Sequence, residues 1–159
     1  MKDRAILFVD DSIVRGTTSK QLVLMARAAG AKKVYFASAA PAIRYPNVYG
    51  IDMPCRKELI AYKRTEADVA NVIGADWMVY LPLEKLVEAV KSCSKDGPKE
   101  FDTSCFDGKY VTGDIDEAYI ERIESERDDL SLAKKNRCLS PFGDVIDIHN
   151  RPPKRARNV

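Results

Sequence analysis

An apolar run that ends in two adjacent aspartates constrains the fold more than any other feature of the sequence. Residues 5–9, Ala-Ile-Leu-Phe-Val, are continuously apolar and rich in strand formers, which is typical of a buried parallel strand. Asp10 and Asp11 follow directly. The pattern predicts a strand, a loop and a helix, with the loop at the carboxyl edge of a parallel sheet. In open α/β sheets this is the edge that binds ligands.

An amphipathic pattern follows the loop and predicts a helix. Leu22, Met25, Ala26 and Ala29 recur at helical spacing, and Gly30 stands where a helix stop belongs. We expect these four side chains to lie on the buried face. The N–H groups of the first turn, together with the positive end of the helix dipole, favour an anion.

The residues of the loop predict a ribose 5-phosphate site. A plain turn explains one acid and several small residues, because these residues cap helices and tolerate turns. Two adjacent carboxylates repel each other, and they suit sugar hydroxyls or a hard cation such as magnesium. Gly16 lets the backbone approach a phosphate. Hydroxyl donors follow it at Thr17, Thr18 and Ser19.

The same loop resembles that of a known family. "VDDSIVRGTTS" is similar to the phosphoribosyl-pyrophosphate (PRPP) loop of type I phosphoribosyltransferases, and its Ser-Ile-Val-Arg version resembles the amidophosphoribosyltransferases in particular. Five more segments occur in the order found in the C-terminal third of those enzymes: "GAKKVYFASAAP", "RYPNVYGIDMP", "ELIAY", "IGAD" and "GKYVTGDID". The resemblance covers residues 4–130.

The resemblance implies a fold and a reaction. The fold is α/β, a partial parallel-sheet type I phosphoribosyltransferase fold with a C-terminal helical extension. The reaction makes 5-phosphoribosylamine from PRPP and glutamine-derived ammonia, the first committed step of purine synthesis. Asp10 and Asp11 are assigned to the ribose hydroxyls and Mg²⁺, and no side chain is assigned as a catalytic base. The 5-phosphate loop comprises Ser12, Ile13, Val14, Arg15, Gly16, Thr17 and Thr18.

Partners follow from the same resemblance. PRPP is the expected substrate, purine nucleotides are possible feedback inhibitors, and the intact enzyme is expected to be a homo-oligomer. In the family, a glutaminase domain with an N-terminal cysteine, a pyrophosphate loop and a lid precede this region, and Met1-Lys2-Asp3 offers no such cysteine. We therefore expect the C-terminal part of a longer enzyme, inactive by itself.

The four cysteines, at positions 55, 93, 105 and 138, form no C-x-x-C pair, and zinc is therefore not predicted. Some family members hold an iron–sulfur cluster. Of the positions that these members use, only Cys105 has a match, and Asn47 stands where one of them carries a cysteine. One ligand cannot hold a cluster, and the chain resembles the cluster-free branch.

Beyond the loop, the sequence predicts alternating strands and helices. Strands are expected at 32–40 and 77–81, with Trp77 and Tyr80 in the core. Thr65 and Asp68 form a capping-box pattern ahead of a helix that Gly74 ends. Pro82 opens a helix with an apolar stripe expected to face the core, at Leu83, Leu86, Val87 and Val90.

The predicted organisation has three parts. Residues 1–93 form the C-terminal portion of the phosphoribosyltransferase domain. Residues 94–140 form a linker and a charged helix over 116–135, and residues 141–159 form a disordered tail that includes "RPPKRARNV". His149 lies in this tail, which disfavours histidine-based catalysis.

Composition and charge exclude several classes. A net charge of +2 gives no argument for nucleic acid. No apolar run approaches the roughly 20 residues of a membrane span, so a cytoplasmic location is expected.

Two alternative functions remain: a non-catalytic module that binds phosphoribosyl compounds or nucleotides, and a receiver-like domain with Asp52 as phosphoacceptor. Pro46 and Gly50 interrupt the strand that a receiver would need before Asp52.

Overall fold

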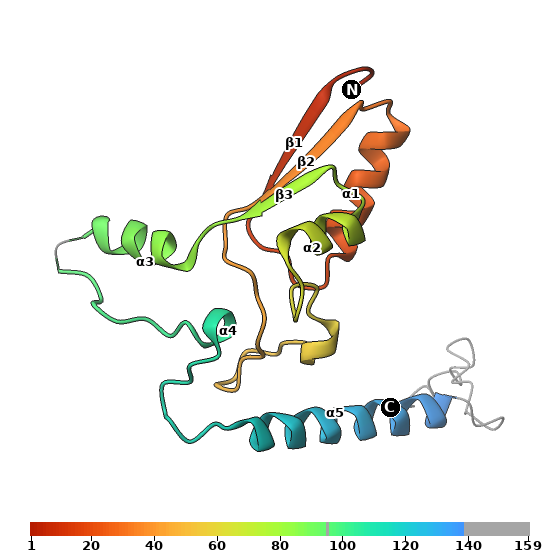
Figure 1. The fold of residues 1–159 in the computed structure, drawn as a ribbon. Helices are drawn as coiled ribbons and strands as arrows, with labels where there is room; N and C mark the ends of the chain where they lie inside the picture. Colours follow the sequence, from red (N-terminus) through yellow and green to blue (C-terminus); the bar gives the residue numbers. More distant parts are fainter. Residues whose placement is uncertain (95, 139–159) are drawn as a thin grey trace, which may run out of the picture. The chain divides into compact units, whose positions relative to one another are not determined.

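The computed structural model describes residues 1–94 and 96–138, and side-chain surroundings through residue 127 (Figure 1). The chain forms two compact units, residues 1–115 and a unit that begins at Asp116. The predicted tail, with His149, lies outside the described residues. Among the described residues, no helix combines the length and the apolar character needed to cross a membrane.

Three parallel strands form the sheet of the first unit. They are β1 (Ala5–Asp10), β2 (Lys33–Ser38) and β3 (Trp77–Tyr80), in the order β1-β2-β3. Asp10 pairs with Ser38 in one ladder, and Ser38 pairs with Tyr80 in the other. The strands therefore end level with one another at the carboxyl edge. All three strand predictions are confirmed, with ends shifted by one or two residues.

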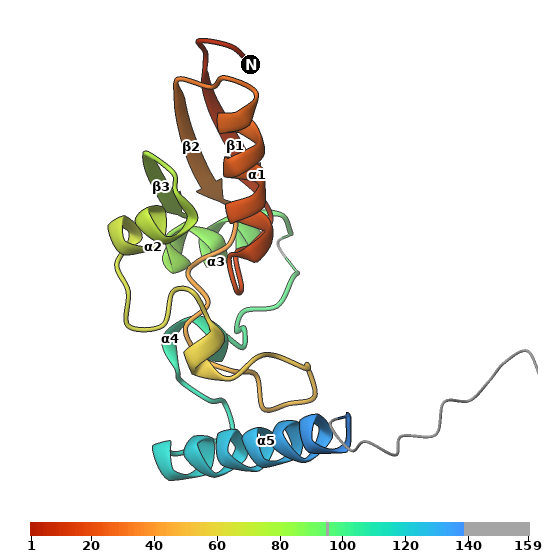
Figure 2. The same ribbon diagram turned by 90° about the vertical axis from the view of Figure 1, so that its right-hand side faces the viewer.

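Helices α1 (Thr17–Ala28) and α2 (Glu66–Ile73) cover one face of this sheet (Figure 1 and Figure 2). Their apolar side chains join those of the strands in one buried core. The predicted capping box begins α2: Asp68 N–H donates to Thr65 Oγ1 at 3.2 Å, and Thr65 N–H donates to Asp68 Oδ2 at 2.9 Å. The main core residues are Val23, Ala26, Val34, Phe36, Val69, Ile73 and Met78.

The buried face of α1 differs in part from the prediction: Ala26 is buried and Leu22 packs against the core, whereas Ala29 is exposed. The buried residues of this helix are Ser19, Val23 and Ala26, whereas Met25 is 67% exposed. The apolar pattern missed two buried positions, because one is a serine and the other, Val23, lies beside the expected stripe. Ser19 is 2% exposed and lies on the inward face of α1 with Val23 and Ala26.

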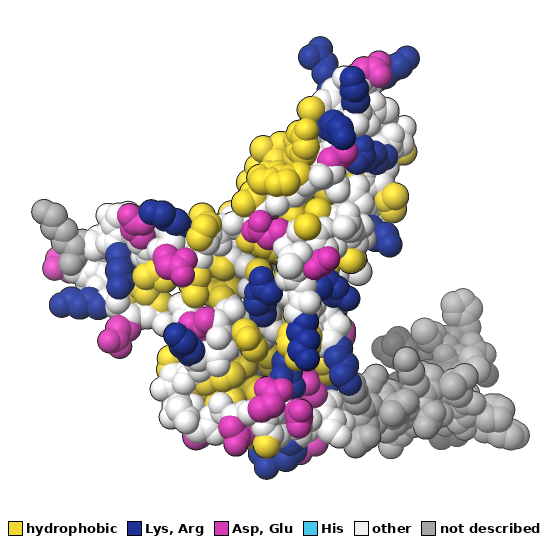
Figure 3. Space-filling model, viewed as in Figure 1, with side chains coloured by type: hydrophobic (Ala, Val, Ile, Leu, Met, Phe, Trp, Pro, Cys, Tyr) yellow, Lys and Arg dark blue, Asp and Glu magenta, His cyan; other side chains and the backbone are white. Residues whose placement is uncertain are grey.

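The opposite face of the sheet is exposed and apolar. Leu7 is 57% exposed, Val9 70% and Trp77 53%, and Figure 3 shows hydrophobic side chains gathered over the strands. The prediction that Trp77 lies in the core is wrong, because side chains alternate along a strand. Met78 and Tyr80 turn toward the helices, and Trp77 turns to the face that the described helices leave bare.

The remaining elements are short, with one exception. They are the 3-10 helix η1 (Arg56–Glu58), α3 (Leu83–Ser92) and α4 (Ser104–Asp107), and in the second unit the charged helix α5 (Glu117–Cys138). The predicted charged helix is confirmed by α5. The prediction for α3 is wrong in one respect: the helix forms, but none of its residues is buried. Of its apolar stripe, Val90 is exposed, whereas Leu83, Leu86 and Val87 are only half-buried.

Candidate functional site

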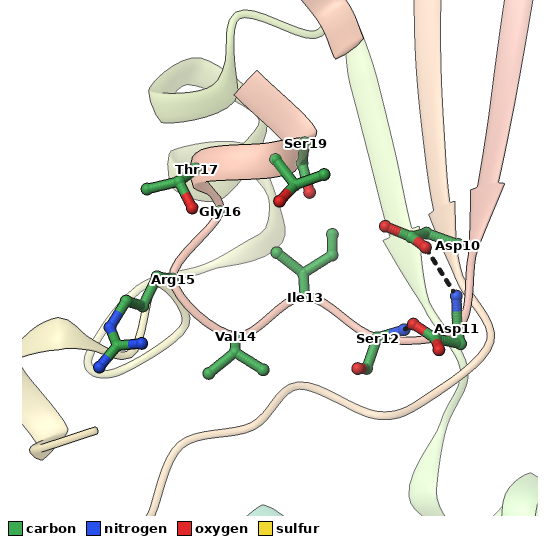
Figure 4. Close-up of a pocket in the computed structure, with 10 residues that line it drawn as sticks. Asp10, Asp11, Ser12, Ile13, Val14, Arg15, Gly16, Thr17 and Ser19 are labelled. Carbon is green, nitrogen blue, oxygen red and sulfur yellow. Dashed lines mark hydrogen bonds between the residues drawn. The ribbon is translucent and has the colours of Figure 1, made fainter. Parts of the chain in front are cut away.

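The loop between β1 and α1 lines a cavity at the carboxyl edge of the sheet (Figure 4). The cavity measures about 320 Å³ and is lined by every residue from Asp10 to Ser19. All the predicted site residues are thus brought together. Asp10 and Asp11 lie at one end of the loop, and Thr17 and Ser19 lie at the other, where α1 begins.

The two carboxylates accept hydrogen bonds from the backbone of the loop itself. Asp11 N–H donates to Asp10 Oδ1 at 3.1 Å, and Ser12 N–H donates to Asp11 Oδ1 at 2.6 Å. Asp11 is exposed and Asp10 is half-buried, so both remain accessible to a ligand. Both residues line the cavity.

Carboxylate oxygens are the donor type that Mg²⁺ prefers, and this ion usually binds through one or two carboxylates, with water and phosphate oxygens completing an octahedron. Asp10 and Asp11 fit that pattern. Across the described residues, no group of three or more His, Cys, Asp or Glu side chains could hold a metal. Magnesium at this loop would therefore need ligands from water or from a bound phosphate.

Gly16 begins α1 in the left-handed region, with φ 74° and ψ 4°. No side chain caps this helix, and its first turn carries no acidic residue, so the N–H groups of the turn are presented to an anion. A Cβ on Gly16 would lie 2.2 Å from Ile60 Cδ1. A larger residue here would force the buried Ile60 side chain to shift, in addition to the strain of the backbone conformation.

The middle of the loop is held by residues far away in the sequence. Ile13 is buried in the core, and Ile60 N–H donates to the Val14 carbonyl at 2.9 Å. Arg15 Nε donates to Glu58 Oε2 at 2.8 Å. Sequence reasoning missed these contacts, because "ELIAY" contains no local signal that would pair it with a loop more than forty residues earlier.

Two other residues share the carboxyl edge with Asp10. Ser38 Oγ donates to the Ala40 carbonyl at 2.8 Å, and Ala39 N–H donates to the Asp10 carbonyl at 2.8 Å. Among the described side chains, the Tyr80 hydroxyl is buried without a hydrogen-bond partner, and this burial raises the pKa of Tyr80 to about 12. Ser38 and Tyr80 could have been identified from the predicted strands, because parallel strands end at a common edge.

Asn47 and Cys105, the two positions that the sequence resemblance matched to iron–sulfur cluster positions of the family, lie side by side. The Asn47 side chain hydrogen-bonds Cys105, and Cys105 Sγ lies 3.6 Å from Met53 Sδ. Burial is the main cause that raises the pKa of the Cys105 thiol, which disfavours the thiolate that a metal needs. The side chain of Cys138 lies outside the described residues. The absence of a cluster stays a prediction.

The receiver alternative does not fit this fold. Asp52 lies in an irregular segment ahead of η1 and not at the end of a strand. In the receiver-type strand order, the first strand lies between the second and the third. Here β2 lies between β1 and β3.

Comparison with known proteins identifies relatives of this chain. No protein-family model matches it. Amidophosphoribosyltransferase of Pseudomonas aeruginosa is 54% identical over 149 residues, which are 94% of this chain and 29% of that protein. The Escherichia coli enzyme is 52% identical over 80% of the chain and 25% of its own length. The Saccharomyces cerevisiae enzyme is 50% identical over 82% of the chain and 25% of its own length.

Solved structures give the same result. Glutamine PRPP amidotransferase from Bacillus subtilis, complexed with ADP and GMP, matches with a TM-score of 0.58 and 38% identity, over 69% of this chain and 24% of that one. The sheet and the loop thus define a protein of the type I phosphoribosyltransferase class. Within this class, these relatives of the chain are amidophosphoribosyltransferases. The chain spans between a quarter and a third of the length of these curated relatives.

Proposed function

We propose that this chain supplies the ribose-phosphate-binding part of an amidophosphoribosyltransferase. The observation that carries the proposal is the loop of residues 10–19, which combines two carboxylates, a left-handed glycine and an uncapped helix start in one cavity. The identity of 54% to the Pseudomonas aeruginosa enzyme supports the same conclusion. The reaction is the first committed step of purine synthesis.

In the proposed reaction, the lone pair of ammonia attacks C1 of PRPP, and the bond from C1 to the pyrophosphate oxygen breaks. Pyrophosphate leaves with the bonding electrons, and the new amine loses a proton to solvent. Ammonia arrives as the neutral amine, so the attack itself needs no general base. The transition state carries positive charge on the ribose, and its main requirements are a fixed geometry and the exclusion of water.

The residues of this chain bind and orient the substrate. The backbone N–H groups and hydroxyls from Ser12 to Thr18 hold the 5-phosphate at the start of α1. Asp10 and Asp11 accept hydrogen bonds from the ribose hydroxyls and fix the position of C1. They would also hold magnesium, which neutralises charge on the pyrophosphate when it is bound.

We further propose that turnover needs polypeptide beyond these residues, including a glutaminase portion. Two observations support this. The chain spans 29% of its Pseudomonas aeruginosa relative, and the exposed apolar face of the sheet, with Leu7, Val9 and Trp77, offers a surface for further structure. Purine nucleotides as regulators, a homo-oligomeric enzyme and a cytoplasmic location belong to the same proposal. The complex of the Bacillus subtilis relative with ADP and GMP supports the nucleotides.

The test is calorimetric titration of the chain with PRPP in the presence of magnesium. Asp11→Asn removes one charge-assisted interaction, and such interactions contribute about 1.5–3 kcal/mol. We therefore expect affinity to fall about tenfold or more. The matched control is Asp3→Asn, an exposed aspartate ahead of the opposite end of β1, which should leave affinity unchanged.

Equal losses in both variants, or no binding by the wild type, would contradict the proposal. An assay with added ammonia separates the alternative of a non-catalytic module. Pyrophosphate release that appears when the missing portion of a relative is supplied supports the enzyme, and binding without any release under those conditions supports the module.

A further inference from the structure

The segment from the last residue of η1 to Ile60 holds the phosphate loop, residues 12–18, at two points. Ile60 N–H donates to the Val14 carbonyl at 2.9 Å, and the Glu58 carboxylate accepts from Arg15 Nε at 2.8 Å. The two bonds join adjacent residues of the loop to residues two positions apart in the segment. Together they restrain the middle of the loop, between the carboxylates at one end and the helix start at the other.

The pair between Arg15 and Glu58 has little value for folding. The two side chains are 53% and 51% exposed, and such surface pairs contribute a median of about 0–1 kcal/mol. A carboxylate beside an anion-binding loop is also unfavourable in itself, because it repels a phosphate. The placement of Glu58 therefore needs a reason other than stability.

The geometry supplies that reason. Figure 4 shows Arg15 extended from the middle of the loop, on the side away from Asp10 and Asp11. Without a partner, a long arginine side chain samples many rotamers and does not restrain this part of the loop. When Arg15 Nε–H donates to Glu58, the hydrogen bond selects one rotamer of Arg15 before a ligand arrives.

We propose that Glu58 is a positioning residue for the phosphate loop. It acts through Arg15, and with the bond from Ile60 to Val14 it orders the loop in the conformation that receives a phosphate monoester. The property that matters is the hydrogen-bond acceptor at this position, and not its negative charge. This inference rests on the proposed function for its ligand, but the ordering of the loop can be measured without any ligand.

The experiment compares Glu58→Ala with Glu58→Gln, using ribose 5-phosphate as the probe. Glutamine keeps a side-chain oxygen that can accept the Arg15 bond, and alanine does not. We expect Glu58→Ala to weaken ribose 5-phosphate binding roughly two- to fivefold, which corresponds to about 0.4–1 kcal/mol. Glu58→Gln should stay within about twofold of the wild type on the same scale. Arg15→Ala should abolish the difference between the two variants.

Amide hydrogen exchange of residues 13–17 in the unliganded chain gives the second measurement. Exchange should accelerate in Glu58→Ala by a similar factor and remain close to wild type in Glu58→Gln. The matched control is Glu88→Ala, because Glu88 accepts from Lys85 Nζ at the same 2.8 Å in an exposed pair on α3. It should change neither binding nor loop exchange.

Two outcomes overturn the proposal: equal effects of alanine and glutamine at Glu58, which indicate a role of charge alone, or an effect of Glu58→Ala that persists in the Arg15→Ala background. If the wild type binds no ribose 5-phosphate but its loop exchange still responds to Glu58→Ala as described, the ligand assignment is wrong and the positioning role stands.

Discussion

Gly16→Ala tests directly how the loop of residues 10–19 packs against Ile60. At φ 74°, an L-residue is disfavoured by about 1–2 kcal/mol. The added Cβ would also lie 2.2 Å from Ile60 Cδ1, and overpacking of this kind destabilises by about 1–3 kcal/mol. The free energy of unfolding should therefore fall by about 2–5 kcal/mol.

The two contributions can be separated. Ile60→Val removes Cδ1, and the next atoms near the added Cβ are at 3.4 and 3.5 Å, which is close to ordinary contact. Alone, Ile60→Val should destabilise by about 0.5–1.5 kcal/mol. In its background, Gly16→Ala should retain only the conformational part, about 1–2 kcal/mol. The coupling between the two positions is then about 1–3 kcal/mol.

Urea unfolding followed by far-UV circular dichroism measures these free energies. The slope of unfolding free energy against urea concentration must be the same in all variants. Gly113→Ala is the matched control, because Gly113 has the same φ of 74° and no atom within 4 Å of an added Cβ. It should show the conformational part alone. The same loss from Gly16→Ala with and without Ile60→Val would refute the packing argument, as would a loss no larger than that of Gly113→Ala.

Two further predictions concern pH. The Asp76 carboxylate accepts hydrogen bonds from Lys33, Val34 N–H and Arg27, of which Lys33 is the largest cause holding its pKa well below the usual range. The stabilisation that ionised Asp76 gives to the fold is thus fully present above the unfolded pKa of about 3.9 and is lost as pH falls further. The difference in unfolding free energy between the wild type and Asp76→Asn should therefore be constant near neutrality and shrink below about pH 4. Burial raises the pKa of Tyr80 to about 12, so the wild type should lose stability as pH rises from about 10 toward that value. Tyr80→Phe should lack this alkaline loss and be as stable as the wild type at pH 7, or more so by up to about 1 kcal/mol, because it removes a buried hydroxyl without a partner; a clear destabilisation at pH 7 would contradict this.

The sequence predicts well what depends on neighbours along the chain. The strand of residues 5–9, the loop with Asp10 and Asp11, and the capping box of Thr65 and Asp68 are all local patterns, and each forms where expected. The site is predictable for the same reason. Its residues from 10 to 19 are consecutive, so one strand end and one helix start are enough to bring them together.

What failed depends on contacts between distant residues. The burial of Trp77 and of the α3 stripe was predicted on the assumption that an apolar side chain is covered by a further layer. In the described structure Trp77 is exposed, and the stripe is half-buried at most. The contacts of Glu58 and Ile60 with the loop depend on the path of the chain between 39 and 60, which has few regular elements. Periodicity carries no information about such a path.

The two main helices of the core begin in different ways. Thr65 and Asp68 complete the first turn of α2 with their own side chains, whereas α1 starts at Gly16 with no side-chain cap. A bound phosphate would itself complete α1, so helix formation and ligand occupancy become linked equilibria. A ligand that binds only the folded chain adds about 2.7 kcal/mol of stability at one hundred times its dissociation constant. The survival of such a chain in a cell would then follow the supply of whatever phosphate ligand it binds, with the folded population rising and falling with the concentration of that ligand.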